Sequence, residues 1–287
     1  MAGTLYICAT PIGNLEDITS RVLRVLSEVD LIACEDTRTS AHLLSRFDIH
    51  TKTTSYHKFN EHTKAQELVD MMLNGANVAL ISDAGTPAIS DPGETLVRLC
   101  GQYHVPVTSL PGANACITAL TLSGKSTRRF AFEGFLPADK KEMKEILAEL
   151  KDERRTIVLY EAPHRLIRTL EALSGVLGEG REITLCRELT KKFETVTATT
   201  IGEAIEDARE KEPRGEYVLV IAGKSADEIE AEKAASFESL TITEHVAMFE
   251  NKGMNRKEAM KAVAAERGIS KRDVYQALLK EEEPSHH

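Results

Sequence analysis

The stretch NVALISDAGTPAISDPGETLVRLCGQYH, residues 77–104, joins an apolar run to an amphipathic one through a loop rich in Gly, Pro and Asp. The apolar run has the β-branched composition of a buried strand, and residues 93–104 have the apolar spacing of a helix. Such a loop is typical either of a surface turn or of backbone held open for a ligand. Taken alone, the stretch leaves both interpretations open.

The same strand–loop–helix pattern recurs through the first half of the chain and predicts a parallel sheet with helices on both faces. The strands after the midpoint are longer and more mixed, which favours a second α/β domain with a partly antiparallel sheet. After residue 224 no further strands are expected: an acidic link at 226–236 leads to three short helices. The predicted fold class is therefore α/β, with two α/β domains at 1–123 and 124–224 and a helical, helix-turn-helix-like extension at 225–287.

The composition indicates a soluble globular protein. Hydrophobic residues make up 42% of the 287 residues and charged ones 28%, with a net charge of −9 that argues against a protein coating nucleic acid with its whole surface. The five cysteines form no CxxC pair and are expected to be buried free thiols, with no metal site. The chain shows no leader pattern and no apolar run long enough to span a membrane, so we expect a cytoplasmic location.

The extension is unusual in its charge. Its last part, residues 251–280, carries eight Lys and Arg against three carboxylates. One interpretation is a solvated helical cap, in which Phe249 and Tyr275 are predicted to be core residues. The other is a surface that contacts RNA phosphates, whose basic side chains are Arg256, Lys257, Lys261, Lys271 and Arg272.

In a parallel sheet, ligands bind beyond the carboxyl ends of the strands. The segments that follow the predicted strands include TPIGN (10–14), CEDTR (34–38), SDAGTP (82–87), LPGANA (110–115), LYEAPHR (159–165) and CRELTKKFE (186–194). None has the pattern of a phosphate-binding glycine loop, so a nucleotide polyphosphate fits poorly.

In this order and spacing, these segments resemble the bacterial 16S ribosomal RNA 2′-O-ribose methyltransferase I family of the tetrapyrrole-methylase superfamily. The resemblance covers residues 1–224 most strongly and extends to the basic tail. It implies two α/β domains with S-adenosylmethionine (SAM) in the cleft between them, in a homodimer. It also implies cofactor contacts at Pro11, Gly13, Asp83, Gly85, Thr86, Ile89, Ala115, Tyr160, Glu161, Leu189, Tyr217 and Val218.

Ribose methylation needs a group that helps remove the proton of a hydroxyl nucleophile. The candidates are polar residues at strand ends. We expect Glu35, Arg38 and His57 to shape the nucleophile site and Lys191 to lower the pKa of the hydroxyl. A local ion pair, a surface loop or a solvent-facing lysine would account for the same residues without catalysis. Asp91 is expected to cap the helix that follows it.

The function implied by the resemblance is SAM-dependent 2′-O-methylation of a cytidine ribose in the decoding region of 16S rRNA within the 30S subunit. The first alternative is methylation of a tetrapyrrole or another small molecule, which would not need the basic tail. The second is a non-catalytic helix-turn-helix binding protein, which would not need several ligand-type loops at successive strand ends.

Overall fold

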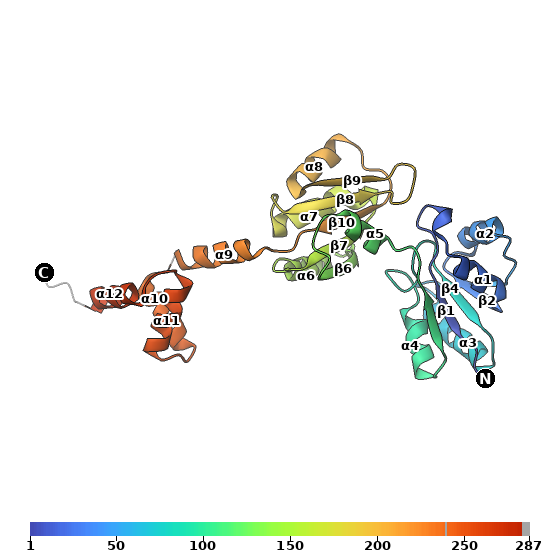
Figure 1. Cartoon of the computed structure of the whole chain (residues 1–287), viewed down its shortest axis with the longest axis horizontal. Helices are drawn as coiled ribbons and strands as arrows, with labels where there is room; N and C mark the ends of the chain where they lie inside the picture. The colour runs from blue at the N-terminus through green and yellow to red at the C-terminus, as the bar shows by residue number, and fades with distance from the viewer. Residues whose placement is uncertain (239, 283–287) are drawn as a thin grey trace. The chain divides into compact units, whose positions relative to one another are not determined.

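A computed structural model describes residues 1–238 and 240–282. The chain divides into two compact units, of which the first comprises residues 1–223 and the second begins at Lys224 (Figure 1). The first unit contains both sheets. Among the helices of the described residues, none combines the length and the apolar character that crossing a membrane requires.

The first sheet has the strand order β3-β2-β4-β1-β5, and every pairing in it is parallel, as predicted. Its strands are β1 (Leu5–Cys8), β2 (Leu31–Cys34), β3 (Thr53–Ser55), β4 (Val78–Ile81) and β5 (Val107–Leu110). Strand β3 was not predicted from the sequence, because its three hydroxyl-bearing residues show no apolar alternation. It is an edge strand, recognisable only by its pairing with β2.

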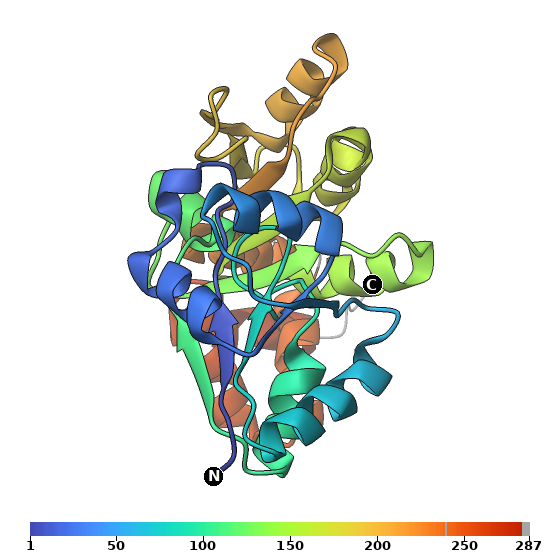
Figure 2. The same cartoon turned by 90° about the vertical axis from the view of Figure 1, so that its right-hand side faces the viewer.

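Helices cover both faces of this sheet (Figure 2). Successive residues of β4 accordingly pack on alternate faces. Val78 and Leu80 pack with one cluster of buried residues, while Ala79 and Ile81 pack with another. A strand buried on both faces is apolar throughout, which explains the continuous run VALI. The helices that follow these strands are η1 (Leu15–Asp17), α1 (Ser20–Glu28), α2 (Thr37–Arg46), α3 (Glu61–Leu73) and α4 (Glu94–Gln102).

The second sheet is mixed, as expected, with the order β6-β7-β10-β8-β9. Strand β6 pairs with β7 in parallel, and the other pairings are antiparallel. The strands are β6 (Phe130–Phe135), β7 (Thr156–Glu161), β8 (Glu182–Arg187), β9 (Thr195–Thr200) and β10 (Tyr217–Ile221). The helices are α6 (Lys140–Leu150), η2 (Pro163–Arg165), α7 (Leu166–Leu177) and α8 (Ile201–Glu210).

Helix α5 (Ala115–Leu122) connects the two halves of the first unit. Its Cys116, Ala119 and Leu120 pack against residues of β7, β8 and β10, on the face of the second sheet opposite α6–α8. The helix therefore follows the first sheet in sequence but belongs to the packing of the second. The predicted domain boundary at residue 123 stays a prediction.

The second unit contains α9 (Ala226–Glu238), α10 (Ile242–Asn251), α11 (Arg256–Glu266) and α12 (Lys271–Glu282). The last three share one apolar core and match the helices predicted for this region. The acidic link predicted at 226–236 lies in helix α9, which no apolar face marks in the sequence. The prediction for Phe249 is confirmed, but Tyr275 is 53% exposed and contributes no core.

A buried histidine ties α10 to the end of α11. His245 is fully buried, and its Nδ1 accepts a hydrogen bond from Nε of Arg267 at 3.1 Å. Nε2 therefore carries the proton and donates to Glu266 at 3.1 Å. Burial and the neighbouring Arg267 lower the pKa of His245, which favours the neutral imidazole.

Candidate functional site

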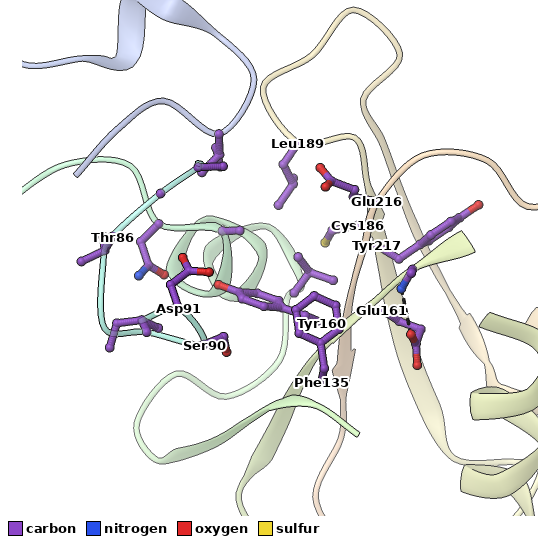
Figure 3. Close-up of a pocket in the computed structure, with 18 of the residues that line it drawn as sticks. Thr86, Ser90, Asp91, Phe135, Tyr160, Glu161, Cys186, Leu189, Glu216 and Tyr217 are labelled. Carbon is purple, nitrogen blue, oxygen red and sulfur yellow. Dashed lines mark hydrogen bonds between the residues drawn. The ribbon is translucent and has the colours of Figure 1, made fainter. Parts of the chain in front are cut away.

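A cavity of about 310 Å³ opens in the first unit, within the size range of small-ligand sites (Figure 3). Loops from both halves of that unit line it. The predicted cofactor residues among its lining are Asp83, Gly85, Thr86, Ile89, Ala115, Tyr160, Glu161, Leu189, Tyr217 and Val218. Pro11 and Gly13 do not line it themselves, although Ile12 between them does.

The loop after β4 is fixed by hydrogen bonds to two other strand-end loops. Thr10 and Gly85 form an antiparallel bridge, with N···O distances of 2.8 and 3.0 Å. The hydroxyl of Thr86 donates to the carbonyl of Ala113 at 3.0 Å, so this side chain holds the protein's own backbone. Ala88 and Ser90 have φ values of 67° and 65°, a conformation that costs side-chain-bearing residues energy and persists where the surroundings impose it.

Tyr160 connects the second sheet to the start of α5. Its hydroxyl accepts a hydrogen bond from the backbone N–H of Cys116 at 3.0 Å. Its ring contacts Phe132 and Phe135 edge-on, with centroid distances of 4.9 and 5.6 Å. Burial raises the pKa of Tyr160 to about 12, so the hydroxyl stays neutral. The result is a rigid aromatic wall on one side of the cavity (Figure 3).

Glu161, at the end of β7, is 1% exposed and its carboxylate is satisfied by the protein. It accepts hydrogen bonds from the hydroxyl of Thr169 and from the backbone N–H of Ala162, and Arg165 lies 3.5 Å away. This carboxylate fixes the backbone beneath the cavity and acts as a positioning residue.

Three further carboxyl groups influence one another at the carboxyl edge of the first sheet. Burial is the largest cause that raises the pKa of Glu35, Asp83 and Asp91. Repulsion adds to it, from Asp83 at Glu35, from Asp36 at Asp83, and from Glu35 and Asp83 at Asp91. For Asp91 the pKa rises to about 6, because burial and Glu35 outweigh a hydrogen bond from Ser82. This edge of the cavity therefore favours a cationic ligand.

The expectation that Asp91 caps a helix was wrong. Helix α4 begins at Glu94, its N-cap is Gly93, and no side chain among the described residues caps it. Asp91 lines the cavity and is drawn beside Tyr160 in the close-up (Figure 3). The left-handed conformation of Ser90 turns the chain at this point, and no local sequence pattern predicts that turn.

The predicted catalytic residues from the first half lie around this edge rather than in the cavity lining. The charge of Asp83 raises the pKa of Glu35, and His57 lowers it. Nδ1 of His57 is buried and has no hydrogen-bond partner within the described part of the chain. The side chain of Arg38 is 88% exposed and donates hydrogen bonds to both oxygens of Asp36, which caps α2 and whose backbone N–H donates to Asp83 at 3.3 Å.

Lys191 lines the cavity from the second half. Its ammonium group lies 2.9 Å from Glu188 and 2.8 Å from Glu216. Desolvation acts against its charge, but the hydrogen bonds to Glu216 and Glu188 outweigh it and raise the pKa of Lys191. Gly13 leaves room for this side chain, because a Cβ there would lie 2.4 Å from Cγ of Lys191.

Sequence reasoning did not find several residues of the lining. Phe135 ends β6, so the strand-end rule could have found it. Glu216 could not be found in that way, because it precedes β10, which runs antiparallel to its neighbours. In this pairing Tyr217 lies opposite Glu161 and Arg187, so the start of β10 reaches the site. The other missed residues are Ile12, Ala84, Ser90, Asn114, Ala162 and Cys186.

The cysteines are all buried and unpaired. Within residues 1–238 and 240–282, no group of three or more His, Cys, Asp or Glu side chains is arranged to hold a metal ion. The basic residues singled out in the extension, Arg256, Lys257, Lys261, Lys271 and Arg272, are all exposed.

Residues 4–205 match the family model described as "Tetrapyrrole (Corrin/Porphyrin) Methylases". Halalkalibacterium halodurans has a "Ribosomal RNA small subunit methyltransferase I" that is 46% identical over 95% of this chain and 93% of its own length. The protein of that name from Vibrio cholerae is 51% identical over 77% of this chain and 78% of its own length. The chain belongs to this methyltransferase family.

The fold agrees with that assignment. The uroporphyrin-III-C-methyltransferase from Thermus thermophilus superposes with a TM-score of 0.53 over 76% of this chain and 94% of its own, at 18% identity. At this identity the likeness concerns the fold alone. It confirms the predicted tetrapyrrole-methylase fold, and the helical extension accounts for the part of the chain beyond it.

Proposed function

We propose that the protein transfers the methyl group of SAM to the 2′-hydroxyl of a cytidine ribose in 16S rRNA. The observation that carries this proposal is the cavity, in which backbone loops and carboxylates from one sheet face aromatic and aliphatic side chains from the other. The names of the curated relatives support an RNA acceptor.

The chemistry of the lining fits SAM. Its methionine end is cationic and suits the edge formed by Asp83 and Asp91, where carboxylates lie in a partly desolvated setting. Its adenine suits the apolar wall of Tyr160, Leu189 and Val218. SAM supplies an activated methyl group, so the chain's own residues need mainly to align the acceptor and remove a proton.

Glu35 is the group best suited to accept that proton. Burial raises its pKa, which brings the carboxylate closer to the basicity that a general base needs near neutral pH. His57 lies close enough to stabilise the charged form of Glu35, which supports a positioning role. Lys191 supplies a fixed positive charge, held by Glu188 and Glu216, that favours ionisation of the hydroxyl.

The second unit is proposed to bind the RNA backbone. Its exposed lysines and arginines stand on two helices of a bundle that has its own core, so their charge is presented by a rigid surface. The acceptor in this proposal is the decoding region of 16S rRNA in the 30S subunit, and the enzyme works in the cytoplasm as a homodimer.

Two measurements test the proposal. Titration calorimetry should detect SAM binding by the wild-type chain, and a binding protein without a methyl-donor site would give no heat. Labelled methyl transfer from SAM should then be compared between 30S subunits and uroporphyrinogen III. Label in the RNA alone is the expected result, and label in the tetrapyrrole alone would instead support the small-molecule alternative.

A further inference from the structure

Two tight turns of the first unit have the same construction, one in each half. Residues 57–60, His-Lys-Phe-Asn, close with a hydrogen bond from the N–H of Asn60 to the carbonyl of His57 at 2.9 Å. Residues 191–194, Lys-Lys-Phe-Glu, close with one from Glu194 to Lys191 at 3.1 Å. Both turns place a Lys-Phe pair at their two central positions.

The side chain of the last residue braces each turn. Oδ1 of Asn60 accepts the backbone N–H of His57 at 2.9 Å, and its Nδ2 donates to the carbonyl of Ser55 at 3.3 Å. The carboxylate of Glu194 accepts the N–H of Thr190 at 2.6 Å. Hydrogen-bonded backbone therefore holds the two phenylalanines in place.

Both phenylalanines face solvent. Phe59 is 97% exposed and Phe193 is 66% exposed, although each ring could bury a large apolar area elsewhere. Lysines accompany them: Lys58 and Lys192 are exposed, and Nζ of Lys192 lies 5.6 Å from the centroid of the Phe193 ring. An apolar face beside a positive charge is suited to a partner that offers a flat ring and a negative group.

The turns adjoin the candidate site. Ser55, at the end of β3, pairs with Cys34 at the end of β2, so residues 57–60 and Glu35 emerge at the same edge of the sheet. The second turn begins at Lys191, which itself lines the cavity. Each turn therefore lies next to a residue proposed to act on the acceptor hydroxyl, Glu35 in the first half and Lys191 in the second.

We propose that the two Lys-Phe turns hold unstacked nucleotides next to the target ribose, with Phe59 and Phe193 stacking on bases and Lys58 and Lys192 contacting phosphates. Exposed aromatic rings beside cations are the usual means of binding single-stranded RNA. A second copy of the chain fits these turns less well, because a symmetric contact would bring like-charged lysines together. This inference rests on the proposed function and narrows its acceptor to unpaired RNA.

The test uses the full-length variants Phe59→Ala, Phe193→Ala and their double, with Phe59→Trp to retain a stacking face. Tyr103→Ala is the matched control, because Tyr103 is 44% exposed but lies at the end of α4, before β5 begins. A short single-stranded RNA carrying 2-aminopurine is the probe, since stacking quenches its fluorescence. SAM calorimetry and the KM and kcat for 30S methylation complete the measurements.

Each alanine variant should raise the Kd for the probe about tenfold and the double variant about a hundredfold, with weaker quenching. Phe59→Trp and Tyr103→Ala should bind like the wild type, SAM affinity should not change, and the loss in methylation should fall mainly on KM. An unchanged Kd and KM in the double variant would overturn the inference. So would a changed oligomeric state with unchanged RNA affinity, which would assign the turns to a second copy.

The outcome is separable from that of the proposed function. If wild-type protein transfers no methyl group to 30S subunits, the proposed function fails, and the quenching experiment still decides whether the turns bind unstacked bases. If the wild type methylates RNA and the double variant does so equally well, only the turn inference fails.

Discussion

The cavity of the first unit and the helical bundle of the second differ in charge and in how they present it. At the cavity, three carboxyl groups with raised pKa values lie at the edge of a small, backbone-lined space. In the bundle, cations stand exposed on α11 and α12 around an apolar core. Under the proposed function, the cavity is suited to a small cationic ligand and the basic side chains of the bundle to the RNA backbone.

The largest effect is expected from the aromatic wall of the cavity. Tyr160→Ala removes both the hydrogen bond to Cys116 and the ring packed against Phe132 and Phe135, so we expect a loss of about 3 kcal/mol in the free energy of unfolding. Tyr160→Phe should lose only about 1 kcal/mol. Urea titrations of both variants measure the difference, and equal losses would show that the ring contributes nothing beyond its hydroxyl.

Removing basic side chains from the bundle should weaken RNA binding without changing SAM binding. Replacing Arg256, Lys257, Lys261, Lys271 and Arg272 by Gln should weaken rRNA binding about a hundredfold at low salt. The slope of log Kd against log salt should fall by about one for each phosphate that the variant no longer neutralises. SAM affinity, measured by calorimetry on the same protein, should remain at the wild-type value. A similar loss of SAM affinity would contradict the assignment of RNA binding to the bundle and SAM binding to the cavity.

The pH dependence of the stability of Asp91→Asn tests the carboxylate edge of the cavity. Because burial raises the folded-state pKa of this carboxyl from 3.8 to about 6, the folded wild type holds its proton more tightly than the unfolded chain. The wild type therefore loses stability as the pH rises through that interval, whereas the variant does not. At pH 8 the variant should be more stable by about 1 kcal/mol, after discounting for solvent screening, and should bind SAM more weakly.

Measured by urea unfolding, this advantage of Asp91→Asn should disappear at pH 4, where the wild-type carboxyl is protonated too. Ser109→Ala, on β5, serves as a control without a titrating group. A variant that is less stable than the wild type at pH 8 would mean that the carboxylate has a stabilising partner and that the cavity edge is not poised for a cation.

The smallest change in stability is expected at Arg38. Because water and salt screen its exposed pair with Asp36, the pair should contribute little to stability, and Arg38→Ala should unfold almost like the wild type. Methylation of 30S subunits by Arg38→Ala and by His57→Ala measures the role predicted for each. Full activity of both variants would remove these two residues from the nucleophile site.

The fold was largely predictable, because buried parallel strands and amphipathic helices carry strong periodic signals. Strand β3 lacked such a signal, since Thr53–Ser55 is defined by its neighbour β2 and not by its own residues. Helix α9 was missed for a related reason: its residues show no apolar face.

The site was predictable where a loop follows a strand and not where the backbone turns unexpectedly. Thr86 and Tyr160 were found at strand ends, and the resemblance supplied Tyr217. Asp91 was assigned to a helix cap because the left-handed conformation of Ser90, which depends on tertiary contacts, has no local signature. The pairing of the two Lys-Phe turns could not be predicted either, since the exposure of Phe59 and Phe193 depends on the folded structure.

The proposed function requires that the cavity deliver a methyl group from SAM to an RNA ribose. Mass spectrometry of nucleosides tests this directly, on 30S subunits incubated with the protein and SAM carrying a deuterated methyl group. The deuterated methyl is expected in 2′-O-methylcytidine from the decoding region of 16S rRNA. Label confined to a base, or no label in the RNA while SAM binds, would contradict the proposed function.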